Sequence, residues 1–215
     1  HDPLGRRVAQ WDPRFTEVGD APNLTFGYSL SGAVLRRHNV DAGVRIVLHG
    51  TAEQALIGWD ARGTLRCTRY DAQLRPVAAY ERLAGEAAER CLQRWRYGDA
   101  DAAGDNGAGR LCRHDDPAGI RVWPVYSLAG EPLTELRRFL KTLHLPDWPD
   151  AEAEREALLE DTAYPTAWTY DAAGAPLDQT DARGHRRSRR YAVDGALASI
   201  QLTWADGSTH VLASG

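Results

Sequence analysis

One group of residues in the sequence, His114-Asp115-Asp116, has the side-chain types needed for acid–base catalysis. Adjacent carboxyl groups can share a proton and shift each other's pKa. Neighbouring residues on a β-strand point to opposite faces of a sheet, however, so His114 and Asp115 would diverge. Asp116 also opens the turn-like sequence Asp116-Pro117-Ala118-Gly119. We therefore expect a turn at this place and no catalytic cluster.

A second group is the basic run from Arg183 to Arg190, which includes His185 and has the composition of a nucleic-acid contact. The whole chain has a formal net charge of -4. A single basic strand on an acidic chain is more often solvated or paired with carboxylates, so we expect no nucleic-acid partner. Ser29 and Ser31 lack the flanking glycines of a nucleophile elbow and are not expected to be nucleophiles.

The three cysteines, Cys67, Cys91 and Cys112, are widely spaced and form no C-x-x-C pair. A structural zinc site needs four close ligands, so neither a metal site nor a disulfide framework is expected. The sequence suggests no cofactor and assigns no residue to catalysis, which predicts a protein that is not an enzyme. The seven Trp and eight Tyr residues could form a carbohydrate-binding platform, although aromatic residues before turns also pack across strands.

These residues must be positioned by the most regular pattern of the chain, an Asp followed three positions later by a Gly. Asp at the first position of a type I turn can accept hydrogen bonds from backbone N–H groups, and Gly at the fourth position adopts a positive φ without a Cβ clash. Such a turn joins two antiparallel strands. Structural turns are predicted at Asp2 and Gly5, Asp60 and Gly63, Asp101 and Gly104, Asp116 and Gly119, Asp171 and Gly174, and Asp181 and Gly184.

Short runs of alternating polar and apolar residues, separated by turn signals, indicate an extended antiparallel sheet. Strands are predicted at Leu24 to Tyr28, Ala33 to Arg37, Val44 to Leu48, Gln54 to Trp59, Thr64 to Tyr70, Val77 to Glu81, Gln93 to Tyr97, Gly109 to Arg113, Arg121 to Tyr126, Trp168 to Tyr170, Leu177 to Thr180, Arg189 to Tyr191 and Ile200 to Trp204.

One short helix is expected as an insertion at about residues 147–161. Asp150 could cap the run Ala151 to Glu160, which is rich in good helix formers. Leu133 to Leu143 has helical leucine spacing, but its strand-rich surroundings favour a strand. Gly98 to Gly109 is polar and rich in Gly and Asp, which predicts an exposed loop.

The repeated unit resembles the Tyr-Asp-x-x-Gly-x-Leu hallmark of YD, or RHS, repeats. Tyr170-Asp171-Ala172-Ala173-Gly174-Ala175-Pro176-Leu177 is similar to it, Trp59-Asp60-Ala61-Arg62-Gly63-Thr64-Leu65 is a Trp variant, and Tyr191 to Leu197 is a degenerate copy. An ordered set of segments also resembles the N-terminal part of the C component of insecticidal toxin complexes. This set comprises Phe26 to Gly32, Trp95 to Gly98, Gly109 to Ile120, Tyr126 to Leu133, Arg138 to Lys141 and Asp147 to Pro149.

The resemblance implies an all-β protein whose antiparallel repeats form part of a large curved β-shell. In that family the B and C components together enclose the hypervariable C-terminal toxin part of the C chain, which is cleaved off autoproteolytically. The implied partners are a B-type component, the chain's own C-terminal toxin region and, indirectly, an A-type pore component. The implied location is a secreted or extracellular toxin complex that is assembled in the bacterial cytoplasm, without direct membrane insertion of this chain.

We expect residues 1–215 to be one partial repeat region without a separate toxin or protease domain. The sequence contains no methionine and starts within a repeat, which predicts a fragment or a trimmed product. No stretch approaches the ~20 apolar residues that cross a bilayer. The expected function is a structural shell segment that encapsulates a C-terminal cytotoxic cargo. Two alternatives remain, namely the shell of an RHS-type secretion effector and a surface carbohydrate-binding module.

Overall fold

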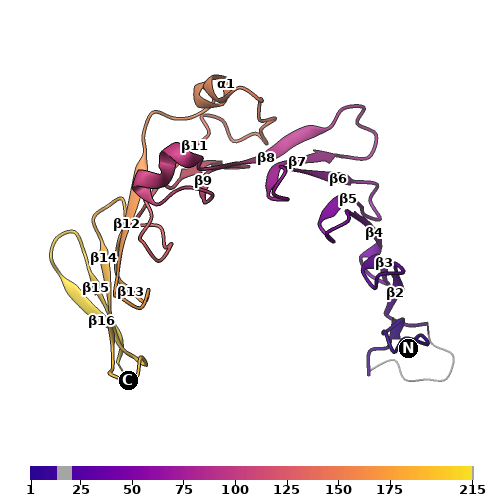
Figure 1. Cartoon of the computed structure of the whole chain (residues 1–215), viewed down its shortest axis with the longest axis horizontal. Coiled ribbons are helices and arrows are strands. Elements are labelled where there is room, and N and C mark those ends of the chain that lie inside the picture. Colours follow the sequence, from indigo (N-terminus) through magenta and orange to yellow (C-terminus); the bar gives the residue numbers. More distant parts are fainter. Residues whose placement is uncertain (14–20, 215) are drawn as a thin grey trace. The chain divides into compact units, whose positions relative to one another are not determined.

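The computed structural model describes residues 1–13 and 21–214, and these residues are nearly all β. Strands that are consecutive in the chain are neighbours in the sheet, in the order β1 to β16, as the colours of Figure 1 allow the reader to follow. The pairs with a defined register are antiparallel. The expectation of an all-β antiparallel fold with one short α-helix is therefore confirmed.

The strands are short, as expected for a chain with turn signals at close intervals. Their bounds are β1 Ala9–Gln10, β2 Leu24–Tyr28, β3 Val34–Asn39, β4 Gly43–His49, β5 Ala55–Trp59, β6 Leu65–Tyr70, β7 Pro76–Arg82, β8 Arg90–Tyr97, β9 Leu111–Asp116, β10 Gly119–Val122, β11 Thr134–Phe139, β12 Tyr164–Tyr170, β13 Pro176–Thr180, β14 Arg186–Tyr191, β15 Leu197–Thr203 and β16 Thr209–Ser214.

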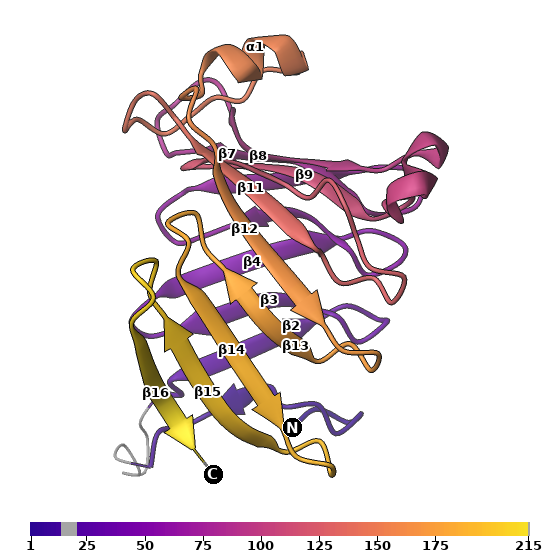
Figure 2. The same ribbon diagram turned by 90° about the vertical axis from the view of Figure 1, so that its left-hand side faces the viewer.

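The chain divides into two compact units, each with its own packing. Unit 1 consists of His1–Arg94 and Pro146–Trp148, and unit 2 consists of Trp95–Leu145 and Pro149–Gly215. In unit 2, β12 to β16 pair in succession and lie side by side in Figure 2. Each pair is a hairpin whose corner holds the register, so local turn chemistry organises the sheet.

The buried centre of unit 1 includes a segment from outside the strands. Asp147 Oδ1 accepts a hydrogen bond from the Cys91 N–H at 2.8 Å, and the Trp148 N–H donates to the Cys91 carbonyl at 2.9 Å. Arg94 Nε donates to the Trp148 carbonyl at 3.0 Å. Trp148 is only 1% exposed and Cys91 only 2%. Pro146–Trp148 therefore lies along β8 like a further extended segment.

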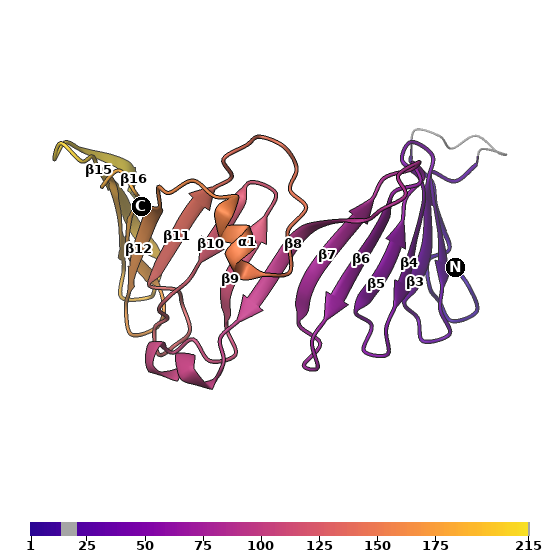
Figure 3. The same cartoon turned by 90° about the horizontal axis from the view of Figure 1, so that it is seen from above.

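In unit 2 the helix α1, Glu152–Ala157, lies over β9 and β11, to which its side chains are bonded (Figure 3). The chain then returns to the sheet, where Leu159 is fully buried and forms a bridge with Leu140. The Lys141 N–H donates to the Leu158 carbonyl at 2.9 Å. These contacts fix both the helix and the segment that follows it against the strands.

Several boundaries differ from the sequence expectations. The helix is shorter than Ala151 to Glu160, and its N-cap residue is Ala151, which makes no side-chain capping bond, so the expected cap at Asp150 is wrong. The Asp150 carbonyl instead accepts a hydrogen bond from Arg155 Nη1 at 2.6 Å. The expected loop from Gly98 to Gly109 contains a 3₁₀ helix, η1, at Ala100–Asp105. The expected strand at Leu133 to Leu143 is confirmed as β11.

Candidate functional site

The tight turn that recurs between consecutive strands, which we call the corner, is best described at Asp60. The Gly63 N–H donates to the Asp60 carbonyl at 3.0 Å, and the Asp60 N–H donates to the Thr64 carbonyl at 3.2 Å. Asp60 Oδ1 also accepts from the N–H groups of Arg62 and Thr64, both at 3.0 Å. The hydrogen bond from the Thr64 backbone holds the pKa of Asp60 below its usual range. The carboxylate thus satisfies two backbone donors that the tight turn leaves without a carbonyl partner.

The same pair of backbone hydrogen bonds closes the corners at Asp2, Asp171 and Asp181. Each of these carboxylates accepts from the second and fourth residues after it. The fourth residue of the corner needs a positive φ, which glycine adopts without steric cost. The φ values are +76° at Gly5, +80° at Gly63, +85° at Gly174 and +83° at Gly184.

Of the other two predicted turns, one is absent and one is present with a different geometry, in which Asp116 Oδ1 still accepts a hydrogen bond from the Ala118 N–H at 2.8 Å. Asp101 and Gly104 lie within the 3₁₀ helix η1, so the hairpin turn predicted there is wrong. Asp116 and Gly119 face each other across a two-residue loop between β9 and β10. Gly119 has a φ of +144°, and a Cβ at this position would collide with the backbone of Arg138 on β11. This glycine is required by the close approach of the next strand, which the sequence pattern does not report.

The pattern of Asp and Gly three positions apart does not include corners that lack the initial Asp or the final Gly. The same closing bonds occur in the corners that begin at Ser29, Gly50, Asp71, Ser127, Ala192 and Trp204. In two of these corners the positive φ belongs to another residue, +61° at both Glu53 and Leu74. The backbone bonds define the corner, and the Asp side chain only strengthens it.

A tyrosine directly before a corner has a second structural role. The hydroxyl of Tyr70 donates to the Ala55 carbonyl at 2.8 Å, and that of Tyr191 donates to the Pro176 carbonyl at 3.0 Å. Tyr28 and Tyr170 make the equivalent bond to Arg7 and Pro132. The tyrosine therefore links each of these four corners to a carbonyl earlier in the chain. The recurring Tyr before the corner was the available sequence signal, although it did not reveal this bond.

The most deeply buried ionic group of the described residues lies between α1 and the strands of unit 2. We call Arg113, Asp115, Arg138, Glu152, Arg155 and Glu156 the α1 ion cluster. Asp115 is 1% exposed and Arg113 3%. Arg113 Nε donates to Asp115 Oδ1 at 2.6 Å, and Arg155 Nε lies 3.0 Å from Asp115 Oδ2.

Glutamates of α1 complete the α1 ion cluster. Arg113 Nη1 donates to Glu152 Oε1 at 3.0 Å and also to Glu156. Arg138 on β11 donates to the second oxygen of Glu156. Burial by itself would raise the pKa of the Glu156 carboxyl, but the hydrogen bonds from Arg113 and Arg138 outweigh burial and lower the pKa. Burial raises the pKa of the Asp115 carboxyl, against the hydrogen bond from Arg113. The cluster therefore fastens α1 to the sheet.

His114 and Asp116 lie on the opposite face of β9 from Asp115, as expected from strand alternation. The His114 ring stacks on Trp95 with centroids 5.2 Å apart, and burial lowers the pKa of His114. Asp116 accepts two hydrogen bonds from Arg137, at 2.5 and 2.9 Å. Burial by itself would raise the pKa of the Asp116 carboxyl, but these hydrogen bonds outweigh burial and lower the pKa. The three residues thus do not converge on one catalytic centre.

The basic run is paired in part with carboxylates. Arg186 donates to the two oxygens of Asp178 on the neighbouring strand, at 3.0 and 2.7 Å, and the Ser188 hydroxyl donates to the same carboxylate at 2.7 Å. These bonds, the one from Arg186 first, lower the pKa of Asp178 to about 2. One arginine of the run is therefore already bound to an acidic side chain.

The three cysteines are free thiols, with Cys91 buried and the other two half-buried. Within residues 1–13 and 21–214, no group of three His, Cys, Asp or Glu side chains is arranged to hold a metal ion. In the same described part of the chain, no helix is both long and apolar enough to cross a membrane.

Comparison with known proteins gives two curated relatives. The toxin subunit YenC1 of Yersinia entomophaga is 31% identical over 222 residues, which cover 99% of this chain and 23% of YenC1. The toxin subunit YenC2 of the same organism is 30% identical over 223 residues, covering 94% of this chain and 23% of YenC2. The chain thus spans about a quarter of the length of these relatives. No protein-family model matches it.

Solved structures with the same fold come from toxin complexes. The crystal structure of TcdB2-TccC3-TEV matches 96% of this chain and 10% of its own with a TM-score of 0.83 and 29% identity. The crystal structure of TcdB2-TccC3 matches 89% with a TM-score of 0.80 and 30% identity. The Tc holotoxin pore of Photorhabdus luminescens matches 90% with a TM-score of 0.81. The chain is therefore a homologue of part of the YenC toxin subunits and shares its fold with part of the TcdB2-TccC3 structures.

Proposed function

We propose that this chain is a non-catalytic wall segment of a C-type toxin-complex subunit, built from RHS repeats, that helps to enclose a C-terminal cytotoxic cargo. The observation that carries the proposal is the match of 96% of the chain to a TcdB2-TccC3 structure at 29% identity. The homology to the YenC subunits supports the assignment to a toxin-complex component. The partners would be a B-type component and, indirectly, an A-type pore component of a secreted complex.

The architecture supports a wall. Strands that pair in chain order leave few free edges along a sheet, and each new hairpin extends the same surface. The corners repeat one backbone arrangement with different side chains, so the wall tolerates sequence variation between them. Asp115, one member of the group considered for acid–base catalysis, is instead paired with Arg113 and Arg155 beneath α1. We take each of these features as support for containment as the function.

The proposal can be tested by limited proteolysis of the natural subunit that carries this sequence, purified together with its B-type component. We expect the C-terminal cargo to be cleaved at least about tenfold more slowly in the complex than when it is free. The Asp115→Asn variant, which disrupts the α1 ion cluster, should accelerate cargo cleavage. Arg69→Gln, which alters an exposed ion pair with Glu89 and the contact of Arg69 with the Tyr80 ring, is the matched control. Equal cleavage rates for free and assembled cargo would contradict the proposal.

A further inference from the structure

One face of unit 1 contains a hollow that the wall function does not use. Val47 on β4, Gly58 on β5 and Arg66 on β6 lie in one row across the sheet, because Val47 pairs with Gly58 and Gly58 pairs with Arg66. Cross-strand partners point to the same face. Gly58 has no side chain, so a gap opens between its two neighbours. We call the resulting cavity of about 200 Å³ the Gly58 hollow.

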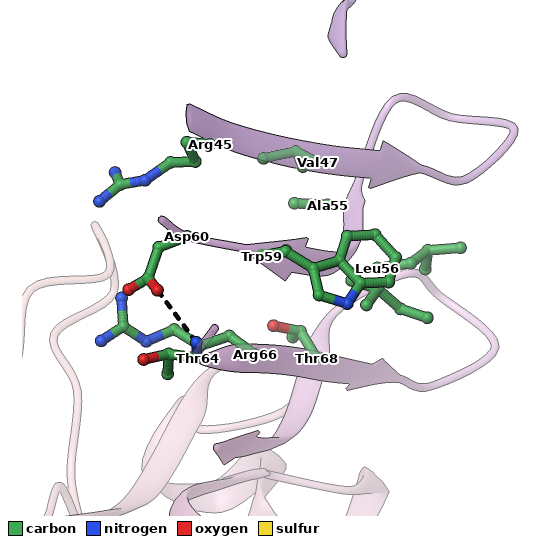
Figure 4. Close-up of a pocket in the computed structure, with 11 residues that line it drawn as sticks. Arg45, Val47, Ala55, Leu56, Trp59, Asp60, Thr64, Arg66 and Thr68 are labelled. Atoms are coloured by element: carbon green, nitrogen blue, oxygen red, sulfur yellow. Dashed lines mark hydrogen bonds between the residues drawn. The ribbon is translucent and has the colours of Figure 1, made fainter. Parts of the chain in front are cut away.

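The Gly58 hollow has an apolar end and a charged end (Figure 4). Val47 and Leu56 line one end, while Arg45, Asp60 and Arg66 lie at the other. The cavity is of the size that accepts an apolar side chain, since an engineered cavity of about 150 Å³ binds benzene. A ligand that fills it would therefore bring an apolar group to Gly58 and direct its next polar group toward the arginines.

The charged end opens into a wider depression of about 630 Å³, which is lined by Arg37, Arg45, Arg62 and Arg66. Arg66 Nε donates a hydrogen bond to Glu81 Oε2 at 2.8 Å, and the Asp60 carboxylate accepts a hydrogen bond from the Thr64 backbone within its own corner. Arg45 and Arg37 are exposed and, within the described part of the chain, their side chains make no hydrogen bond or ion pair. They face each other across β3 and β4 and so share one face. Two adjacent guanidinium groups on an open surface favour a carboxylate.

The spacing defines the ligand. Along a strand, residues two apart lie about 6.6–6.8 Å from each other on one face. Val47 and Arg45 are two residues apart on β4, so this distance also separates the apolar end of the Gly58 hollow from its charged end. An extended peptide with an apolar residue, any residue and then a glutamate presents its two side chains with the same spacing. We infer that the Gly58 hollow binds extended peptides with an apolar-x-acidic sequence. This inference stands whether or not the chain encloses a cargo.

The experiment is a calorimetric titration of the whole chain with the peptide acetyl-Gly-Leu-Thr-Glu-Gly-amide. We expect saturable binding that weakens about tenfold or more when Glu is replaced by Gln or Leu by Ser in the peptide. Arg45→Gln should weaken binding about tenfold, because it removes one charge-assisted hydrogen bond. Binding should also weaken as salt is raised from about 50 to 300 mM, because exposed charges are screened.

Two further variants separate the site from the surrounding surface. Gly58→Val fills the cavity and should abolish binding. A Cβ on Gly58 would lie 3.6 Å from the Ile46 carbonyl oxygen and 3.9 Å from Val47 Cγ2, which are ordinary contacts, so this variant should fold. Arg36→Gln is the matched control, since Arg36 is an exposed arginine on the same strand as Arg37 but on the opposite face. It should bind as the unaltered chain does.

Several results would overturn the inference. Binding that is unaffected by Gly58→Val would place the peptide elsewhere. Equal loss in Arg36→Gln and Arg45→Gln would show general attraction to a basic surface. Competition by inorganic phosphate alone, with the apolar residue of the peptide making no difference, would reduce the site to a simple anion site. Circular dichroism and the urea midpoint of each variant exclude unfolding as the cause of any loss.

Discussion

Arginine has two opposite settings in this molecule. Arg113 in unit 2 is 3% exposed and contacts three carboxylates, whereas Arg45 in unit 1 is exposed and its side chain has no ionic partner within the described residues. Both lie on β-strands of similar length, but β9 itself contains Asp115, whereas β4 contains no acidic residue. The helix α1 adds Glu152, Arg155 and Glu156 over one face of its sheet.

This difference teaches where charge stabilises the fold and where it remains available. A buried arginine that has lost its hydration depends on its partners, so the removal of one partner leaves an uncompensated charge. An exposed arginine remains hydrated, contributes little to stability and can bind a ligand at small cost. The α1 ion cluster therefore stabilises the fold of unit 2, whereas the exposed side chain of Arg45 in unit 1 is available to bind a ligand.

The largest expected effect comes from breaking the α1 ion cluster. Asp115→Asn should lower the free energy of unfolding by about 3–5 kcal/mol, because Arg113 and Arg155 lose the carboxylate between them. Arg45→Gln should change it by less than about 0.5 kcal/mol. Urea unfolding monitored by circular dichroism measures both. Similar losses in the two variants would remove the distinction between buried and available arginines.

A smaller effect tests the backbone beside the same cluster. Gly119→Ala should cost about 2–4 kcal/mol, since its Cβ would collide with the Arg138 backbone on β11. Gly195→Ala is the matched control, because Gly195 also has a positive φ, +82°, but no atom lies within 4 Å of the added Cβ. It should cost only about 1–2 kcal/mol for the left-handed conformation. Equal costs in urea unfolding would mean that β10 and β11 can separate freely.

The sequence predicted those parts of the fold that depend on neighbouring residues. The corner at Asp60 was predictable because its side chain and the backbone groups that it binds lie within four residues of one another. The α1 ion cluster was not, because Arg113 and Glu156 are distant in sequence and meet only after α1 folds over β9. The corner predicted at Asp101 was wrong because the pattern cannot distinguish a hairpin turn from a 3₁₀ helix.

The candidate binding surface escaped the sequence for a different reason. Gly58 matters because its missing side chain leaves a gap in the sheet face. This gap can be recognised only once the strand pairing places Val47 and Arg66 on either side of it. Periodicity placed Arg45 on a strand but could not show whether an acidic residue would face it. Pairing across strands, and not composition, decides which arginines are neutralised.

The ion pair between Asp178 and Arg186 is intermediate between the buried arginines of the α1 ion cluster and the exposed Arg45. Its contribution to stability should depend on pH. The folded-state pKa of Asp178 is about 2, below its ordinary value of 3.8, so its contribution to stability is present above pH ~4 and is lost as the pH falls toward 2. Asp178→Asn should therefore abolish part of the acid sensitivity between pH ~4 and 2. The check is the urea midpoint of both proteins across this range. Parallel pH profiles would show that the pair makes no net contribution.

The smallest effect concerns two consecutive corners of unit 1, one closed by Gly63 and the other by Leu74. Leu74 has a φ of +61° and an exposed side chain, so it bears the cost of a left-handed residue without compensating burial. Leu74→Gly should raise the free energy of unfolding by about 0.5–1 kcal/mol, the difference between this cost and the added chain entropy of glycine. Gln73→Gly, one residue earlier at a position without positive φ, should lower it by a similar amount. If both substitutions destabilise the chain equally, the closing position of the corner has no special backbone requirement.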